Sequence, residues 1–155
     1  MEKTLVLIKP DAVQRGFIGR VIARIEDRGL QIIGAKMLKL SEEMVTNLYP
    51  HQVDKDFFPR LKNFMTSAPV IALAVQGDKA IEATRKLLGK TNPLKAEMGT
   101  IRGDWALTIG ANLVHCSDAS KTAERELDLF FNPEEILNYP QATGDWLREE
   151  PWEQN

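Results

Sequence analysis

The stretch Thr4–Ile8, of sequence TLVLI, is a continuous run of β-forming residues that stops at Lys9 and Pro10. An apolar run of this length without polar alternation is typical of a strand covered on both faces. Proline cannot continue a central strand, so we expect the strand to end before it. The stretch therefore predicts a buried strand near the start of the chain.

Alternating helix and strand patterns follow this run. The predicted strands are Leu30–Leu40, Pro69–Val75 and the short piece Asn112–His115. The predicted helices are Gly19–Arg28, Ser41–Tyr49, Asp56–Met65, a segment from Gly77-Asp78 to Gly89, and Ala119–Phe131. This order resembles the split β-α-β, ferredoxin-like plan, an α+β fold in which helices cover an antiparallel four-stranded sheet.

Two regions need a more specific prediction. In the second strand, we expect Leu30, Ile32, Lys36, Leu38 and Leu40 on one side, and Ile33 and Met37 on the other. Residues 90–104 show no clear period, which predicts a long functional loop. We expect one domain over residues 1–139, and a tail over 140–155 that packs on the domain or on a neighbouring subunit through Trp146 and Trp152.

Composition sets limits on the class of protein. The 155 residues carry a net charge of −2, so any phosphate binding must rely on locally placed cations. A single cysteine excludes an internal disulfide framework and fits a reducing compartment. No apolar run approaches the roughly 20 residues of a membrane span. We expect a cytoplasmic protein.

The segment Asn112–Asp118, NLVHCSD, contains one of the two histidines of the chain. His115 lies at a predicted strand end, before Ser117 and Asp118, which are typical of a helix start. A lone histidine is most often partly buried and satisfied by a backbone carbonyl group. At a strand end facing a helix N-terminus, it is also a candidate nucleophile.

A carboxylate is expected beside this histidine. Glu126 shares the inward side of its predicted helix with Ala123, Leu127 and Phe130, and a buried acid needs a partner. It is the best candidate to accept the N–H of His115 and set its tautomer. The alternative is an ion pair with Arg125 or Lys121 on an outer face.

Candidate cations and neutral hydrogen-bond donors come from separate places. Lys9 follows the first strand, Arg102 lies between glycines in Gly99–Asp104, and Thr91 lies in Leu88–Pro93, LGKTNP, which lacks the P-loop spacing. Each one alone is an ordinary surface residue. With Asn112 and His115, they indicate phosphoryl transfer.

These motifs, together with residues 4–16 (TLVLIKPDAVQRG) and Phe57-Phe58, resemble the nucleoside diphosphate kinase family from about Lys3 to Tyr139. The resemblance implies ping-pong transfer of a γ-phosphoryl group, mainly from ATP, to nucleoside diphosphates through His115. It implies Mg²⁺ carried on the nucleotide phosphates, with Asp118 reaching it through water if at all, and no metal site built from protein ligands. The other roles that it implies are orientation of the histidine by Glu126, a position near the transferred phosphate for Tyr49, contacts to phosphates and sugar hydroxyls for Lys9, Arg85, Thr91, Arg102 and Asn112, and a base slot of Phe57, Leu61 and Ile109.

The chain departs from the family at a few positions. Cys116 stands where a glycine or alanine is usual, and we expect it to be packed and inert, the alternative being a site sensitive to oxidation. Pro50 alters the segment before the base slot, and His51 there is expected to be a surface residue. The resemblance also implies a homo-oligomer, a hexamer or a tetramer built from dimers.

Two other functions compete with the enzyme. Ferredoxin-like sheets also bind single-stranded nucleic acid, but the acidic balance disfavours nucleic acid as the main partner. A structural oligomer that has lost catalysis is disfavoured by the intact histidine and cations.

Overall fold

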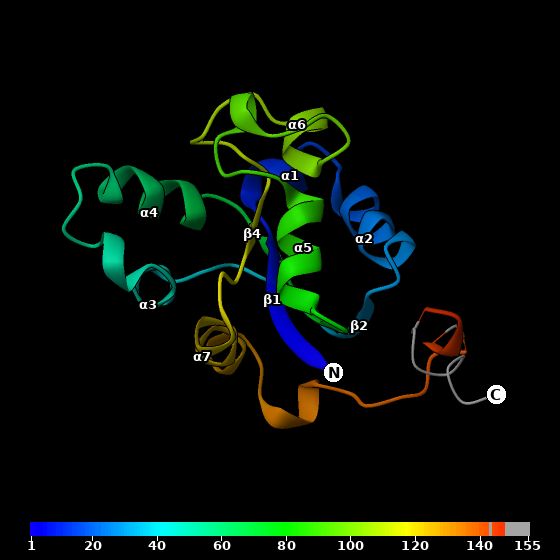
Figure 1. Cartoon of the computed structure of the whole chain (residues 1–155). Coiled ribbons are helices and arrows are strands. Elements are labelled where there is room, and N and C mark those ends of the chain that lie inside the picture. The colour runs from blue at the N-terminus through cyan, green and yellow to red at the C-terminus, as the bar shows by residue number, and fades with distance from the viewer. Residues whose placement is uncertain (143, 148–155) are drawn as a thin grey trace.

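A computed structural model describes residues 1–142 and 144–147 of the chain, which fold around a four-stranded antiparallel sheet (Figure 1). The strands are β1 (Glu2–Ile8), β2 (Gln31–Leu38), β3 (Val70–Gly77) and β4 (Val114–Cys116), in the order β2-β3-β1-β4. β1 pairs with β3 and β4, and every residue of Thr4–Ile8 is fully buried. The predicted α+β, ferredoxin-like fold is confirmed.

Helices cover both faces of this sheet. They are α1 (Pro10–Gln14), α2 (Ile18–Asp27), α3 (Glu42–Leu48), α4 (Phe58–Thr66), α5 (Ala80–Leu88), α6 (Ile101–Trp105) and α7 (Ser120–Phe130), with short 3₁₀ helices at Pro50–Gln52, Pro93–Lys95, Pro133–Glu135 and Gly144–Leu147. Side chains alternate along β1, so Val6 and Ile8 pack with α2 and α5, whereas Leu5 and Leu7 pack with α3 and α7. Figure 1 shows these two layers on either side of β1.

Local signals set several helix ends. The Ser41 side chain accepts a hydrogen bond from the Met44 N–H, which caps α3, and Pro50 separates α3 from the next turn. Gly89 ends α5 at a φ of +83°, a conformation that favours glycine. α1 was not among the predicted helices, although proline suits the first helical position.

The predicted faces of the second strand are wrong because β2 contains a bulge between Ile32 and Gly34. Leu30 and Ile32 pack with α2 and α5, but Ile33, Leu38 and Leu40 pack on the opposite face. The extra residue shifts the alternation by one, so that even-numbered side chains change faces after it.

The predicted structureless loop over residues 90–104 is also wrong. It contains the 3₁₀ turn at Pro93–Lys95 and the start of α6. The Thr100 hydroxyl accepts from the Gly103 N–H at 3.0 Å and caps α6. These are short elements held by caps, which a periodicity of apolar residues cannot reveal.

After α7 the chain returns along the β2 edge. The Leu137 N–H donates to the Ile33 carbonyl at 2.7 Å, and the Tyr139 hydroxyl donates to the Ile32 carbonyl at 2.7 Å. Trp146 is 75% exposed, and Trp152 lies outside the described residues. Among the helices of the described residues, none has the length and apolar content needed to cross a membrane.

Candidate active site

Strand register decides which way His115 points. His115 pairs with Leu7 in the antiparallel β1–β4 ladder, so its side chain lies on the face covered by α3 and α7. Cys116 pairs with Val6 and packs on the opposite face of the sheet. The two neighbours in sequence therefore do not share an environment.

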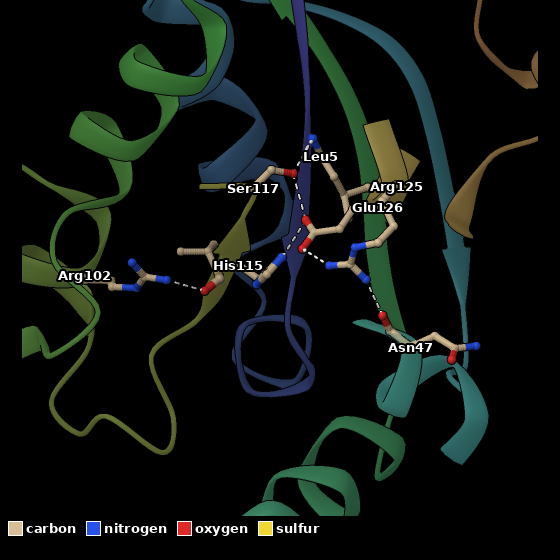
Figure 2. A network of polar contacts seen from close by, with 8 residues as sticks. Leu5, Asn47, Arg102, His115, Ser117, Arg125 and Glu126 are labelled. Atoms are coloured by element: carbon tan, nitrogen blue, oxygen red, sulfur yellow. Dashed lines mark hydrogen bonds and ion pairs between the residues drawn. The ribbon is translucent and has the colours of Figure 1, made fainter. Parts of the chain in front are cut away.

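The structure brings His115 and Glu126 together, as Figure 2 shows. His115 Nε2 lies 3.0 Å from Glu126 Oε2, and the Ser117 hydroxyl donates to the same oxygen at 2.7 Å. Glu126 is only 2% exposed. A carboxylate accepts hydrogen bonds, so this contact places the ring N–H of neutral His115 on Nε2 and leaves Nδ1 with its lone pair free.

The second oxygen of Glu126 faces a cation. Arg125 Nη2 lies 3.6 Å from Glu126 Oε1, while Arg125 Nη1 donates to the Asn47 carbonyl in the last turn of α3 at 2.5 Å (Figure 2). The alternative ion pair with Arg125 is thus present together with the histidine contact. It joins the buried carboxylate to an arginine side chain that is 42% exposed.

The predicted helix start at Ser117 and Asp118 is wrong. α7 begins at Ser120, and its N-cap residue, Ala119, offers no side-chain oxygen. The Ser117 hydroxyl is committed to Glu126 and also accepts from the Leu5 N–H at 3.4 Å. A serine before a helix is typical of a cap, whereas Ser117 belongs to the buried network around the histidine.

Tyr49 lies at the end of α3, beside the histidine. The two rings meet edge to face, with centroids 5.5 Å apart. Burial, and next the charge of Glu126, raise the pKa of Tyr49 well above its ordinary value. Its hydroxyl is buried and has no hydrogen-bond partner among the described residues, so the site holds a neutral phenol O–H that is free to donate.

Lys9, Asn112 and Thr91 form one connected group. Lys9 Nζ donates to Asn112 Oδ1 at 2.8 Å, and Asn112 Nδ2 donates to the Thr91 carbonyl at 2.9 Å. Lys9 is 7% exposed, and burial, followed by the charge of Arg102, lowers its pKa to about 8. An incoming anion would relieve this electrostatic cost.

Arg102 joins this group through the backbone. It donates from Nη1 to the Gly89 carbonyl at 2.7 Å, from Nη2 to the Val114 carbonyl at 2.6 Å and from Nε to the Asn112 carbonyl at 3.3 Å. Burial lowers its pKa, but guanidinium remains charged in proteins. The N–H groups not used for carbonyls remain for an anion. Arg85, exposed on α5, adds a second guanidinium close enough to lower the pKa of Arg102 further.

Burial also decides the state of the cysteine. It raises the pKa of the Cys116 thiol to about 11, although Arg102 acts in the opposite direction. The thiolate is the reactive form, and it is scarce at neutral pH under these conditions. This supports the expectation of a packed, inert cysteine.

The residues predicted to form the base slot lie on exposed segments. Phe57 precedes α4 and is 52% exposed, Leu61 is half-buried on α4, and Ile109 is 61% exposed in the segment between α6 and β4. Figure 1 shows α3 and α4 standing to one side of the sheet. The two predicted walls therefore come from parts of the chain that are distant in sequence.

Acidic residues do not gather at this site. Within residues 1–142 and 144–147, there is no group of three or more His, Cys, Asp or Glu side chains that could hold a metal ion. Asp118, an exposed carboxylate just after β4, lies near enough to act on the pKa of Cys116.

One contact at the site was not predicted, although both of its residues lie in the sequence motifs. Asp11 Oδ2 accepts the Leu113 N–H at 3.0 Å, and Leu113 has a φ of +72°. The carboxylate and the residue that it holds are separated by more than a hundred positions, so neither motif by itself indicates that they meet. Only the backbone geometry reveals this contact.

Comparison with known proteins agrees with this geometry. A sequence profile described as nucleoside diphosphate kinase matches residues 2–136. The chain is 49% identical over 150 residues to the nucleoside diphosphate kinase of Archaeoglobus fulgidus, covering 97% of this chain and 99% of the relative. It is 50% identical over 149 residues to that of Synechococcus sp. (strain JA-3-3Ab), covering 96% and 100%.

Solved structures agree. A halophilic nucleoside diphosphate kinase from Halobacterium salinarum in complex with CDP has a TM-score of 0.93 and 40% identity, covering 96% of this chain and 99% of that one. A nucleoside diphosphate kinase family protein from Babesia bovis has a TM-score of 0.92 and 38% identity, covering 96% and 100%. The chain therefore belongs to the nucleoside diphosphate kinase family, a family of phosphotransferases.

Proposed function

We propose that the chain transfers the γ-phosphoryl group of a nucleoside triphosphate, mainly ATP, to nucleoside diphosphates through a phosphohistidine at His115. The observation that carries the proposal is the 3.0 Å contact between His115 Nε2 and the buried Glu126 carboxylate. It leaves Nδ1 as the nucleophilic nitrogen and places a negative charge where the ring becomes positive.

Two half-reactions use the same site. The Nδ1 lone pair of His115 forms a bond to the γ-phosphorus, while the bond between that phosphorus and the bridging β-γ oxygen breaks and the diphosphate leaves. A terminal phosphate oxygen of a second diphosphate then attacks the phosphorus, and the P–N bond breaks. The imidazole returns unchanged, so the kinetics are ping-pong.

The surrounding donors stabilise the charge on the transferred group. Lys9, Arg85 and Arg102 supply the cations, and the Tyr49 hydroxyl supplies a neutral donor. The Asn112 side chain accepts a hydrogen bond from Lys9 and donates one to the Thr91 carbonyl, so these groups are already assembled before a nucleotide binds. Such groups favour the transition state without having to reorganise during the reaction.

A Mg²⁺ ion that arrives on the nucleotide fits this donor set. The site is rich in cations, and Asp118 is an exposed carboxylate that lines the same cavity as Arg85, which suits an ion held mainly by phosphates and water. When bound, the ion neutralises phosphate charge, and Asp118 would reach it through water.

The apolar slot predicts broad tolerance for the base. Phe57 offers a π face, while Leu61 and Ile109 offer apolar walls, and none of these side chains can read the hydrogen-bonding edge of a base. All nucleoside diphosphates should therefore serve as acceptors.

Brief exposure to γ-labelled ATP with Mg²⁺ tests the proposal. We expect acid-labile, alkali-stable label that mass spectrometry maps to His115, and no label on His115→Ala. The matched control is His51→Ala, because His51 is the other histidine and is exposed. If His115→Ala takes up as much label as the parent, the proposal is wrong.

A chase tests the second half-reaction. Addition of unlabelled deoxythymidine diphosphate to the labelled, nucleotide-free protein should release the label as the triphosphate. A labelled protein that cannot pass its phosphoryl group to any diphosphate would contradict ping-pong transfer and favour a protein that has lost catalysis.

We also propose a homo-oligomer, either a hexamer or a tetramer built from dimers. Exposed apolar side chains such as Leu94, Met98 and Leu107 support contacts between copies. Sedimentation equilibrium measures the mass. The division into a domain over 1–139 and a tail over 140–155 and the cytoplasmic location remain predictions. So does the expectation that nucleic acid is not the main partner.

A further inference from the structure

Leu113 adopts a backbone conformation that leucine rarely takes. Its φ is +72°, and its side chain is fully buried between α5, α6 and the sheet. A bulky residue in this left-handed region is strained and persists only where its surroundings hold it. The Val114 N–H donates to the Asn112 carbonyl at 2.9 Å, which closes a tight three-residue turn around Leu113.

The start of α1 holds both backbone polar groups of this residue. The Leu113 N–H donates to Asp11 Oδ2 at 3.0 Å, and the Leu113 carbonyl accepts from the Lys9 N–H at 2.8 Å. The other carboxylate oxygen of Asp11 is buried without a hydrogen-bond partner among the described residues. A buried polar oxygen without a partner calls for an explanation, and the bond of the other carboxylate oxygen to Leu113 offers one.

The turn sets the distance between the two halves of the site. Asn112, just before it, connects Lys9 to Thr91, and His115 lies two residues after it. If the turn relaxed toward an extended backbone, His115 and Asn112 could not both keep their present partners. The position of the nucleophile relative to the cations therefore depends on the strained residue.

We propose that Asp11 is a positioning residue, whose carboxylate oxygen holds the Asn112–Val114 turn closed and so fixes His115 relative to Lys9 and Asn112. The inference rests on the proposed role of His115 as the phosphoryl carrier. Asp11 does not touch the transferred group. It acts through the backbone of Leu113.

Three variants separate this role from a general effect on charge or folding. Asp11→Ala removes the acceptor, whereas Asp11→Asn keeps an oxygen that can accept the Leu113 N–H but removes the charge. Asp27→Ala, on the exposed end of α2, is the matched control for losing a carboxylate. The readout is the single-turnover rate of His115 phosphorylation at pH 7 and saturating ATP, together with KM.

We expect Asp11→Ala to slow phosphorylation by about tenfold to a hundredfold at saturating ATP, because misplacing a reacting group by about 1 Å has effects of this size. Asp11→Asn should remain within about threefold of the parent, and Asp27→Ala should match it. If Asp11→Ala does not fold, Asp11→Ser replaces it, since a shorter hydroxyl cannot span the same distance.

Each result decides the matter. Phosphorylation of Asp11→Ala, or of its Ser replacement, at the rate of the parent overturns the proposal. Equal losses in the Asn and Ala variants also overturn it, because the charge and not the acceptor would then matter. A parent protein without phosphohistidine contradicts the proposed function itself, which is a separate result from any difference among these variants.

Discussion

The proposed phosphate side and the proposed base side of the site are built differently. On the proposed phosphate side, Lys9, Arg102, Asn112 and Glu126 are each at most 7% exposed. Hydrogen bonds connect Lys9 to Asn112, Arg102 to the backbone, and Glu126 to the side chains of His115 and Ser117. On the base side, Phe57 and Ile109 are more than half exposed. The proposed chemistry depends on a buried polar network, whereas the predicted binding of the base depends on exposed apolar side chains.

This difference explains how the proposed site could fix the geometry of phosphoryl transfer and still accept nucleotides with different bases. Buried polar groups must be paired, so their positions are nearly fixed and a single loss propagates. Exposed apolar side chains share no such hydrogen bonds, so the effect of replacing one of them stays local. Changes on the phosphate side should therefore lower rates, and changes on the base side should mainly weaken binding.

The largest effect is expected from Glu126→Gln. An amide of the same shape removes the charge beside His115 and disturbs the bonds from Ser117 and Arg125, so phosphorylation of His115 should slow about a hundredfold. Single-turnover labelling at saturating ATP measures this rate, and KM should stay within about threefold. A large rise in KM with an unchanged rate would place Glu126 on the binding side of the comparison.

A pH series examines Lys9. Its pKa of about 8 means that the free protein loses this cation as pH rises through 8, so kcat/KM should fall about tenfold between neutral pH and pH 9. Lys9→Arg should abolish the inflection near pH 8, because arginine does not titrate there. An unchanged profile in that variant would assign the inflection to another group.

The same group predicts a stability effect of the opposite sign. The folded pKa lies below the ordinary 10.5, so the unfolded chain binds more protons between pH 8 and 10.5 and stability rises with pH in that window. From pH 8 to 9 the contribution is about 1 kcal/mol. Urea unfolding of the parent and of Lys9→Met at both pH values isolates it, since the variant should lack the rise.

On the base side, Phe57→Ala should raise KM about fivefold to tenfold for every nucleotide, because aromatic stacking contributes about 1–3 kcal/mol per base. The rate at saturation should change by less than about threefold. Acceptor assays with four diphosphates measure both constants. Loss confined to a single base would show edge recognition and contradict the apolar slot.

The smallest effect is expected from Cys116→Ala. The thiol lies on the opposite face of the sheet from His115 and its pKa is raised to about 11, so activity should remain within about threefold of the parent. Iodoacetamide at pH 7 should modify the parent only slowly. Rapid inactivation of the parent but not of the variant would show a reactive cysteine instead.

Elements with strong local patterns were predictable. The apolar run Thr4–Ile8 predicted a strand covered on both faces, and all five residues are buried. The inward position of Glu126 was predictable because it shares a helix face with Leu127 and Phe130. The ferredoxin-like order followed from those elements. In these cases, the physical requirement was contained within one segment of the chain.

Features that depend on contacts between distant segments were not predictable. The bulge in β2 is defined by its pairing with β3, a strand that lies more than thirty residues later in the chain. The Ser117 hydroxyl donates to Glu126 on α7, so this bond depends on how α7 packs against the sheet. Arg102 suggested a phosphate contact, but no pattern indicated that it also donates to three backbone carbonyls. Asp11 was missed for the same reason.

The three carbonyl bonds of Arg102 place it under a double constraint. Replacing Arg102 to change the proposed attraction for phosphate would also leave the carbonyls of Gly89, Asn112 and Val114 without their donor. The proposed affinity for phosphate therefore cannot be changed at Arg102 without also disturbing the backbone that Arg102 holds. Exposed side chains on α3 and α4 are free of this constraint. Replacing one of them would change the predicted affinity for the nucleotide without leaving a buried carbonyl unpaired.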